Sequence, residues 1–268
     1  MKPTRIALLT SPSTASAEAV YRLVGQHSDR IAIVGLSDPL RQPFGAPGAR
    51  TRKILINSRL RLAPYLFVTF VLPRIAAFLK PASGKRSLAT LCRETRIPLA
   101  AFDDINDPAS IAQLQGAGAE TVLMFHFDQI VSAAFIAAFD GAVVNVHPAL
   151  LPRHRGAAPT IHALIDDAPA FGVTLHRVSA AIDDGPILAQ SQCELPPETS
   201  AVDAAFRLHL AGLPLVSAWL AGELRDETLP ESAPYRHWPD AAPLRALARR
   251  GRRLTRLKDI ARAWFAPV

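Results

Sequence analysis

The strongest constraint on the fold is the alternation of short apolar runs with amphipathic segments over the first 147 residues. The apolar runs have strand length and lie at residues 5–10, 31–36, 99–102, 121–127 and 142–146. The segments with helical spacing lie at residues 15–26, 85–95, 108–115 and 132–139, followed by a long one at 200–220. Strands joined through helices pair in parallel with right-handed crossovers. We therefore predict an α/β fold with a Rossmann-like, doubly wound, mostly parallel sheet.

The loop after the first predicted strand has the sequence SPSTAS, residues 11–16. It lacks the Gly-x-Gly-x-x-Gly pattern with which such folds bind dinucleotides. The Rossmann-like start therefore does not imply NAD.

Two polar side chains end the strand that opens AVVNVHPALLPRHRGAAP, residues 142–159. Asn145 and His147 are two positions apart, so in a strand they point to the same face. Open α/β sheets bind ligands at the carboxyl ends of their strands. By itself, His147 could equally cap the strand and hydrogen-bond its own loop.

A carboxylate further along the chain can lie beside Asn145 and His147. Residues 172–178, GVTLHRV, predict a second strand, which leads into a turn with Asp183, and another apolar strand begins at Ile187. Asp183 follows His147 by 36 residues, enough for a helix and a returning strand. An amide, an imidazole and a carboxylate can thus meet at one site.

The segments NVHPALLPRHRGAAP, GVTLHRV and IDDGPI together resemble the formyltransferases that use 10-formyltetrahydrofolate. That family includes glycinamide ribonucleotide, methionyl-tRNA and nucleotide-sugar formyltransferases. The resemblance implies a catalytic domain over residues 1–224 with the formyltransferase fold, and 10-formyltetrahydrofolate as the formyl donor. It also implies that Asn145, His147 and Asp183 are the catalytic residues.

The same resemblance implies further contacts around these three residues. The folate-binding residues would be Phe127, Gln129, Ile130, Val131, Ile182, Asp184 and Gly185. The acceptor-binding residues would be Arg153, Arg155 and Gly156. Either arginine could hold a phosphate or carboxylate of the acceptor, or could only pin the loop. No metal site is indicated.

Three residues depart from the family's pattern. Family members often carry glycine where His126 stands and a different residue at Asp128, which leaves the shape of the pocket open. His126 could be an outward surface imidazole or a ligand contact. Asp184 also replaces a residue that is often Thr or Gly, and Asp183 remains the better catalytic candidate.

The predicted function is transfer of a formyl group from 10-formyltetrahydrofolate to an amine of a small molecule, with an aminosugar nucleotide or an amino-acid derivative favoured. Asn145 would donate a hydrogen bond to the formyl oxygen, and His147 would act as general acid or as a second, charged donor. Asp183 would orient the imidazole and relay the proton. The alternatives are a methionyl-tRNA formyltransferase-like enzyme without the tRNA-binding domain, a glycinamide ribonucleotide formyltransferase, a formyltetrahydrofolate hydrolase and a non-catalytic folate-fold module.

Positive charge is concentrated in two accessory segments. Residues 41–90 contain ten Lys or Arg and no Asp or Glu, and residues 236–268 contain nine against two, in a chain of net charge +7. We read them as a basic and apolar insertion at about 39–85 and a basic extension at 225–268 with a short helical tail. Residues 39–61 are expected to be loop or an extended insertion, and residues 62–79 a helix.

The uncharged run within residues 62–79 is too short to span a membrane. It could pack on the domain or on a second subunit as in a homodimer, or lie on a membrane surface through residues 59–86 with Lys85 among its cations. The tail, over residues 244–264, could dock on the domain or contact a partner such as anionic lipid or RNA. tRNA is the less favoured partner, because the tail is too short for the β-type tRNA-binding domain of the family.

The two cysteines, Cys92 and Cys193, show neither a disulfide framework nor metal-ligand spacing, which indicates a reducing compartment. The N-terminal sequence MKPTRIALLT predicts a first strand and not a signal peptide. We therefore expect a cytoplasmic protein.

Overall fold

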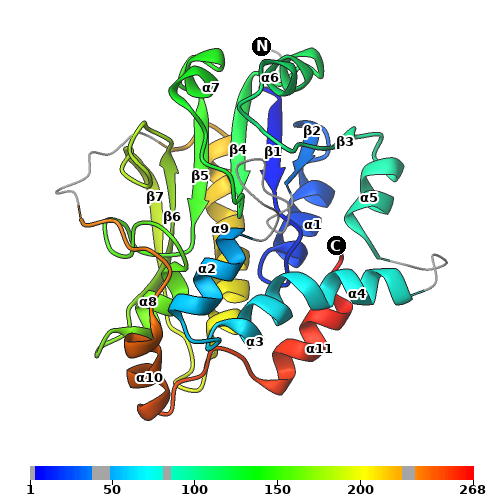
Figure 1. The fold of residues 1–268 in the computed structure, drawn as a ribbon. Coiled ribbons are helices and arrows are strands. Elements are labelled where there is room, and N and C mark those ends of the chain that lie inside the picture. The colour runs from blue at the N-terminus through cyan, green and yellow to red at the C-terminus, as the bar shows by residue number, and fades with distance from the viewer. Residues whose placement is uncertain (1–3, 38–48, 81–85, 225–232) are drawn as a thin grey trace.

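The computed structural model describes residues 4–37, 49–80, 86–224 and 233–268. They form one seven-stranded sheet with helices on both faces (Figure 1). Across the sheet the strands are β3 (Leu99–Ala101), β2 (Ile31–Leu36), β1 (Ile6–Thr10), β4 (Thr121–Phe125), β5 (Val143–His147), β6 (Phe171–Arg177) and β7 (Ile187–Cys193). The pairs from β3 to β5 are parallel, and β6 is antiparallel to β5 and β7. The predicted doubly wound, mostly parallel sheet is confirmed.

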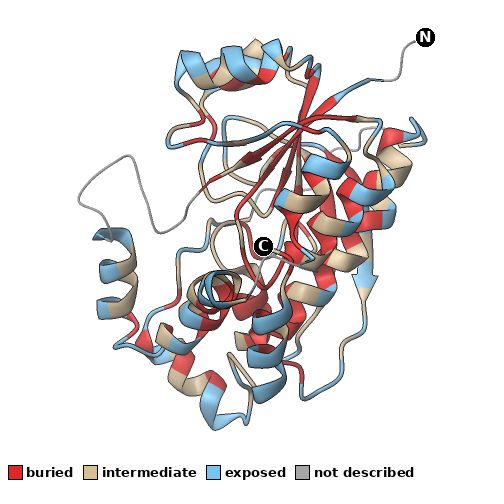
Figure 2. Ribbon diagram, turned by 90° about the vertical axis from the view of Figure 1, so that its right-hand side faces the viewer, coloured by how far each residue is buried: buried red, intermediate tan, exposed pale blue. Residues whose placement is uncertain are grey.

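Buried apolar side chains lie on both faces of the sheet. In Figure 2 the strands are coloured as buried over most of their length. The alternation along β1 separates the two layers, because Ile6 and Leu8 face one core and Ala7 and Leu9 the other. The first core is covered by α1 (Ala17–Gln26), α5 (Leu88–Glu94) and α9 (Ala201–Leu220). The second is covered by α6 (Pro108–Gly116) and α7 (Ala133–Ala138). The helices predicted in these segments are thus present, with ends shifted by a few residues.

A third core joins the insertion to the C-terminal extension. Its helices are α2 (Ala49–Asn57), α3 (Ala63–Leu66), the π-helix η1 (Phe67–Val71), α4 (Leu72–Leu79), α8 (Pro159–Ile165), α10 (Ala241–Arg249) and α11 (Leu257–Phe265). Leu62, Tyr65 and Leu72 of the insertion are buried in one cluster with Leu244 and Ala263 of the extension. The helical tail is therefore present, and it packs against the insertion and against α9.

The π-helix η1 has a local cause. Pro73 has no backbone N–H, so it cannot bond the carbonyl of Thr69 as the next α-helical turn would require. That carbonyl instead accepts from the N–H of Thr14 at 2.9 Å, and the carbonyl of Val68 accepts from the Thr14 hydroxyl at 2.6 Å. These bonds attach η1 to the loop that follows β1, which is how the insertion reaches the carboxyl edge of the sheet.

One part of the predicted secondary structure is wrong. Residues 39–61 were expected to be loop, yet residues 49–57 form α2. Residues 38–48 and 81–85, with Lys85, and residues 225–232 lie outside the described residues. In the described ranges, no helix is both long and apolar enough to cross a bilayer.

Candidate active site

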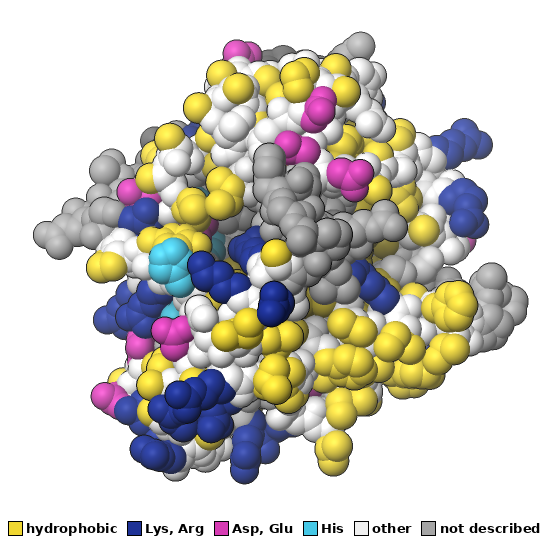
Figure 3. All heavy atoms as spheres, in the orientation of Figure 1, with side chains coloured by type: hydrophobic (Ala, Val, Ile, Leu, Met, Phe, Trp, Pro, Cys, Tyr) yellow, Lys and Arg dark blue, Asp and Glu magenta, His cyan; other side chains and the backbone are white. Residues whose placement is uncertain are grey.

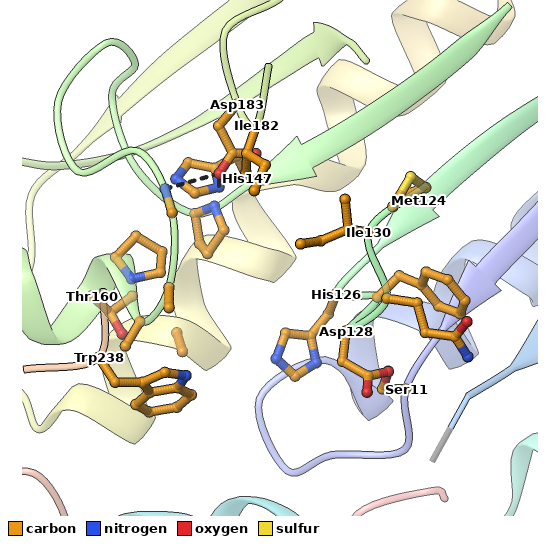
Figure 4. A pocket seen from close by; sticks show the side chains of 18 of the residues that line it. Ser11, Met124, His126, Asp128, Ile130, His147, Thr160, Ile182, Asp183 and Trp238 are labelled. Carbon is orange, nitrogen blue, oxygen red and sulfur yellow. Dashed lines mark hydrogen bonds and ion pairs between the residues drawn. The ribbon is translucent and has the colours of Figure 1, made fainter. Parts of the chain in front are cut away.

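The end of β5 brings the three predicted polar residues together. Antiparallel pairing of β5 with β6 sets Asn145 opposite His176, and Asp183 lies in the turn that leads from β6 to β7. The Asp183 carboxylate is 3.5 Å from Nδ1 of His147 and 3.4 Å from Nδ2 of Asn145 (Figure 4). The spacing argument from the sequence therefore placed these residues correctly relative to one another.

Asp183 is held by the loop that follows β5. Its backbone has a φ of 49°, and its Oδ2 accepts from the N–H of Gly156 at 2.9 Å. Gly156 has a φ of 102°, and a Cβ there would lie 2.5 Å from the carbonyl oxygen of Arg236 and from the ring of Tyr235. Glycine is thus required where the extension crosses this loop. The extension is bonded to it through Arg236 N–H to the Arg155 carbonyl at 2.7 Å and Ala157 N–H to the Arg236 carbonyl at 2.9 Å.

Hydrogen bonds to carbonyl groups assign the imidazole tautomers. Nε2 of His147 is 3.1 Å from the His154 carbonyl, so it carries the proton, and in the neutral ring Nδ1 presents a lone pair towards Asp183. Nδ1 of His176 donates to the Arg177 carbonyl at 2.8 Å, so its Nε2 accepts from Nδ2 of Asn145 at 3.1 Å. His176 therefore orients the amide of Asn145.

The protonation states at neutral pH follow from burial and neighbours. Burial lowers the pKa of His147 below 6.5, and His176 adds to this while Asp183 opposes it. Burial would raise the pKa of Asp183, but the His147 and His176 imidazoles, which are charged in acid, and the Gly156 N–H hold it well below its usual range. The site therefore contains a neutral base, Nδ1 of His147, beside an ionised carboxylate.

A cavity of about 550 Å³ opens beside these residues. Small-molecule sites have volumes of about 300–1,000 Å³. Five of the predicted folate contacts line it, namely Phe127, Gln129, Ile130, Val131 and Ile182. Aromatic and aliphatic side chains of the insertion and the extension form another wall, namely Tyr65, Leu66, Phe67, Phe70, Val71, Tyr235 and Trp238. In Figure 4, Thr160 and Trp238 lie on one side of the cavity, and Met124, Asp128 and Ser11 on the other.

The remaining predicted contacts lie elsewhere, apart from Gly156, which lines the cavity. Arg153, Arg155, Asp184 and Gly185 are not among the described residues that line it. Arg155 is buried and donates to the carbonyls of Ile182 and Ala233, each at 2.8 Å, and pairs with Asp184 at 2.9 Å. It thus pins the loop, the second of the two roles considered for it. Arg153 is exposed, and Gly185 fits a turn where a Cβ would meet the Arg177 carbonyl.

Two of the three residues that depart from the family's pattern, His126 and Asp128, point into the protein. Nδ1 of His126 is 2.9 Å from the Ser13 hydroxyl, and its ring stacks on Phe70 at a centroid distance of 6.0 Å. The outward imidazole considered for His126 is therefore wrong. Burial lowers its pKa to about 4. Asp128 accepts from the Ser11 hydroxyl at 2.6 Å and also from Ser37.

Sequence reasoning missed several residues of the cavity. His176 lies in the segment GVTLHRV, but its pairing with Asn145 depends on the register of β5 and β6. His209 of α9 lines the cavity with Nε2 unpaired among the described residues, while its Nδ1 donates to the Ala205 carbonyl at 2.6 Å. Arg50 and Trp238 come from segments that the sequence marks only as basic accessories. No local pattern indicates that such distant segments reach the same cavity.

Comparisons with known proteins agree with this geometry. Residues 89–217, which contain Asn145, His147 and Asp183, match the family model described as formyl transferase. A methionyl-tRNA formyltransferase of Solibacter usitatus is 31% identical over 127 residues, which cover 47% of this chain and 41% of the relative. The chain thus spans about two fifths of the length of the curated relatives it matches.

Solved structures show the same fold over most of the chain. The phosphoribosylglycinamide formyltransferase from Anaplasma phagocytophilum has a TM-score of 0.57 at 17% identity, covering 87% of this chain and 98% of that one. A sugar N-formyltransferase from a Shewanella species has a TM-score of 0.54 at 14% identity, covering 97% and 87%. Residues 89–217 therefore match the formyl transferase family model, and most of the chain has the fold of these solved formyltransferases.

Proposed function

We propose that this protein transfers a formyl group from 10-formyltetrahydrofolate to an amine of a small molecule in the cytoplasm. The observation that carries the proposal is the cluster of Asn145, His147 and Asp183 at the wall of a largely apolar cavity. Amide, neutral imidazole and carboxylate are the groups that such a transfer needs, and apolar walls exclude the water that would hydrolyse the donor.

The reaction begins when the acceptor amine attacks the formyl carbon, and the formyl oxygen gains negative charge. One N–H of Asn145 is committed to His176 at 3.1 Å, whereas its contact with Asp183 is longer, at 3.4 Å, and can be exchanged for the formyl oxygen. Such a donor is worth about 3 kcal/mol in acyl-transfer sites. His147 accepts the amine proton on Nδ1, and Asp183 stabilises the imidazolium that results.

The same proton then completes the reaction. It passes from His147 to N10 of the folate as the bond from N10 to the formyl carbon breaks. The products are the formamide and tetrahydrofolate. No covalent enzyme intermediate is needed, so the chain contributes by positioning two substrates.

The donor fits the side of the cavity formed by residues 127–131 and Ile182. Ile130, Val131 and Ile182 offer apolar surface there. We assign Phe127 and Gln129 to the same side, although the amide of Gln129 also bonds the Ile105 N–H at 2.8 Å and the Phe102 carbonyl at 3.0 Å. Asp184 and Gly185 support this side through the fold of their turn.

The acceptor fits the wall formed by the insertion and the extension. Tyr235 and Trp238 provide aromatic faces for a base or an aromatic side chain, and the guanidinium of Arg50 suits a phosphate or carboxylate. These groups favour an aminosugar nucleotide or an amino-acid derivative as the acceptor. A methionyl-tRNA formyltransferase-like activity is the second candidate, because the curated relatives that match have that activity.

The test is calorimetric binding of the stable analogue 5-formyltetrahydrofolate to the purified chain, with His147→Ala in parallel. We expect saturable binding by both proteins, and formylation of an acceptor amine by the wild type alone, read as the mass gain of one formyl group. Absence of binding at concentrations far above those of a cofactor site would reject the donor. The hypothesis of a non-catalytic folate-fold module would then be favoured.

The pH dependence tests whether the neutral or the charged form of His147 is the active one. Because burial lowers its pKa below 6.5, the ring is neutral at pH 7 and loses its basic Nδ1 only as the pH falls through the folded-state pKa. We expect kcat/KM to decrease below pH 6.5, in step with an NMR titration of the ring assigned through His147→Gln. An increase of kcat/KM over the same range would show that the charged form is the active one.

A further inference from the structure

An apolar face lies on the two helices that the accessory segments bring together. Seven large hydrophobic side chains are exposed on α4 and α11: Ile75, Phe78, Leu79, Leu257, Ile260, Trp264 and Phe265. Phe78 is 88% exposed, Leu257 85% and Phe265 72%. Figure 3 shows hydrophobic side chains gathered over the region that α4 and α11 occupy in Figure 1. Monomeric proteins rarely expose so many large apolar side chains together unless the surface binds something.

The fold holds this face in place. The opposite sides of the two helices are buried through Leu72 and Ala76 of α4 and Ala263 of α11. The ammonium of Lys80 donates to the Trp264 carbonyl and lies 5.6 Å and 4.6 Å from the ring centroids of Trp264 and Phe265. The aromatic side chains are thus presented outwards by helices that are themselves fixed to the core.

Cations are interleaved with the apolar side chains. Leu60, also exposed, stands between the exposed Arg59 and Arg61, Ile75 follows Arg74, and Leu79 precedes Lys80. Residues 49–80 contain no Asp or Glu. The one carboxylate of α11, Asp259, is completely buried, where it accepts from the Ser200 hydroxyl at 2.6 Å. The apolar face is therefore continuous in sequence with a segment, residues 49–80, that carries Lys and Arg as its only charged side chains.

We propose that this face docks the protein on an anionic lipid surface. Helices that lie in a membrane interface combine aromatic and leucine side chains with Lys and Arg, which is the composition here. Anionic headgroups complement the charge, and long cationic side chains can reach them while their stems stay in the apolar layer. A second copy of the chain would instead bring two positive faces together.

The docked orientation places the active site beside the lipid. The exposed helix α4 continues directly from η1, which forms part of the cavity wall. Phe67 of η1 both lines the cavity and is 45% exposed. A protein docked through this face thus holds one wall of its cavity next to the headgroup layer.

The test is co-sedimentation of the full chain with vesicles of phosphatidylcholine alone and with vesicles that also contain phosphatidylglycerol. We expect binding to the anionic vesicles, weakened by salt and much weaker with phosphatidylcholine alone. Phe78→Ser combined with Phe265→Ser should reduce the affinity at least about tenfold, because each phenylalanine buries apolar area in the lipid. Arg59→Gln combined with Arg61→Gln should reduce the binding to anionic vesicles and its salt dependence.

The matched control is Leu99→Ser, which removes an exposed leucine from β3 at the edge of the sheet. It should bind vesicles as the wild type does, and circular dichroism should show that all variants are folded. Equal binding to both kinds of vesicle, or none to either, would overturn the proposal. So would a concentration-dependent dimer in analytical ultracentrifugation that Phe78→Ser with Phe265→Ser dissociates, because the face would then belong to a second copy.

Discussion

Replacing Asp183 by asparagine is expected to lower kcat/KM for formyl transfer by about a hundred- to ten-thousandfold. The carboxylate is 3.5 Å from Nδ1 of His147, where the imidazolium proton would appear. An amide at this position cannot stabilise that cation, so the proton transfer loses its driving force. The reaction should be followed with 10-formyltetrahydrofolate and whichever amine the acceptor screen identifies.

The structure of the turn should survive this substitution. An amide oxygen can still accept from the Gly156 N–H, which is 2.9 Å from Oδ2 of Asp183. Binding of 5-formyltetrahydrofolate should therefore change by only a few-fold. The matched control is Asp140→Asn, an exposed aspartate that also has a positive φ, 51° against 49°. If Asp183→Asn turned over as fast as Asp140→Asn, the proposed role of the carboxylate would be wrong.

Local patterns in the sequence were sufficient for the sheet and for the three central polar residues. A short run of apolar residues predicts a buried strand, because such a strand needs only a few consecutive residues. Asn145 and His147 share a face through the period of two alone. Asp183 needed only enough intervening chain to return, and the structure places it at 3.4–3.5 Å from both.

Local patterns in the sequence could not predict which residues form the walls of the cavity. Tyr65 and Trp238 both line the cavity although they are far apart in the chain, and their rings meet edge to face at a centroid distance of 6.3 Å. Neither segment has a spacing that indicates its partner. The role of Arg155 could not be predicted from the sequence either, because an arginine in such a loop can bind either the substrate or other groups of the protein. Its partners, Ile182, Ala233 and Asp184, become visible only when the chain is folded.

The junction between the tail and α9 is built on two buried aspartates. Asp203 of α9 pairs with Lys258 at 2.6 Å and with Arg262 at 2.9 Å, both from α11. Asp259 of α11 accepts from the Ser200 hydroxyl, which also caps α9 by accepting from the Asp203 N–H at 3.0 Å. Both carboxylates are completely buried. Ion pairs made by Lys and Arg of the basic tail therefore attach the tail to the domain.

Asp203→Asn is accordingly expected to lower the free energy of unfolding by about 2–3 kcal/mol. Breaking a wholly buried ion pair costs about 3–5 kcal/mol. The loss is smaller here because Lys258 is 42% and Arg262 21% exposed, so both cations can turn to water. The measurement is urea unfolding followed by circular dichroism, where the midpoint should fall with little change in slope.

The matched control is Glu18→Gln, which removes a carboxylate paired with Arg22 and Arg86, both about half exposed. Exposed pairs contribute about 0–1 kcal/mol, so this variant should unfold near the wild type. The difference between Asp203→Asn and wild type should also shrink in acid. Burial opposes ionisation of Asp203, but Lys258, Arg262 and Arg207 lower its pKa below 3.8. The contribution of the ionised carboxylate to the free energy of unfolding is therefore complete above that pH, and it is lost as the pH falls through the folded-state pKa. A difference that persisted below this range would mean that the shape of the side chain, and not its charge, joins the tail to α9.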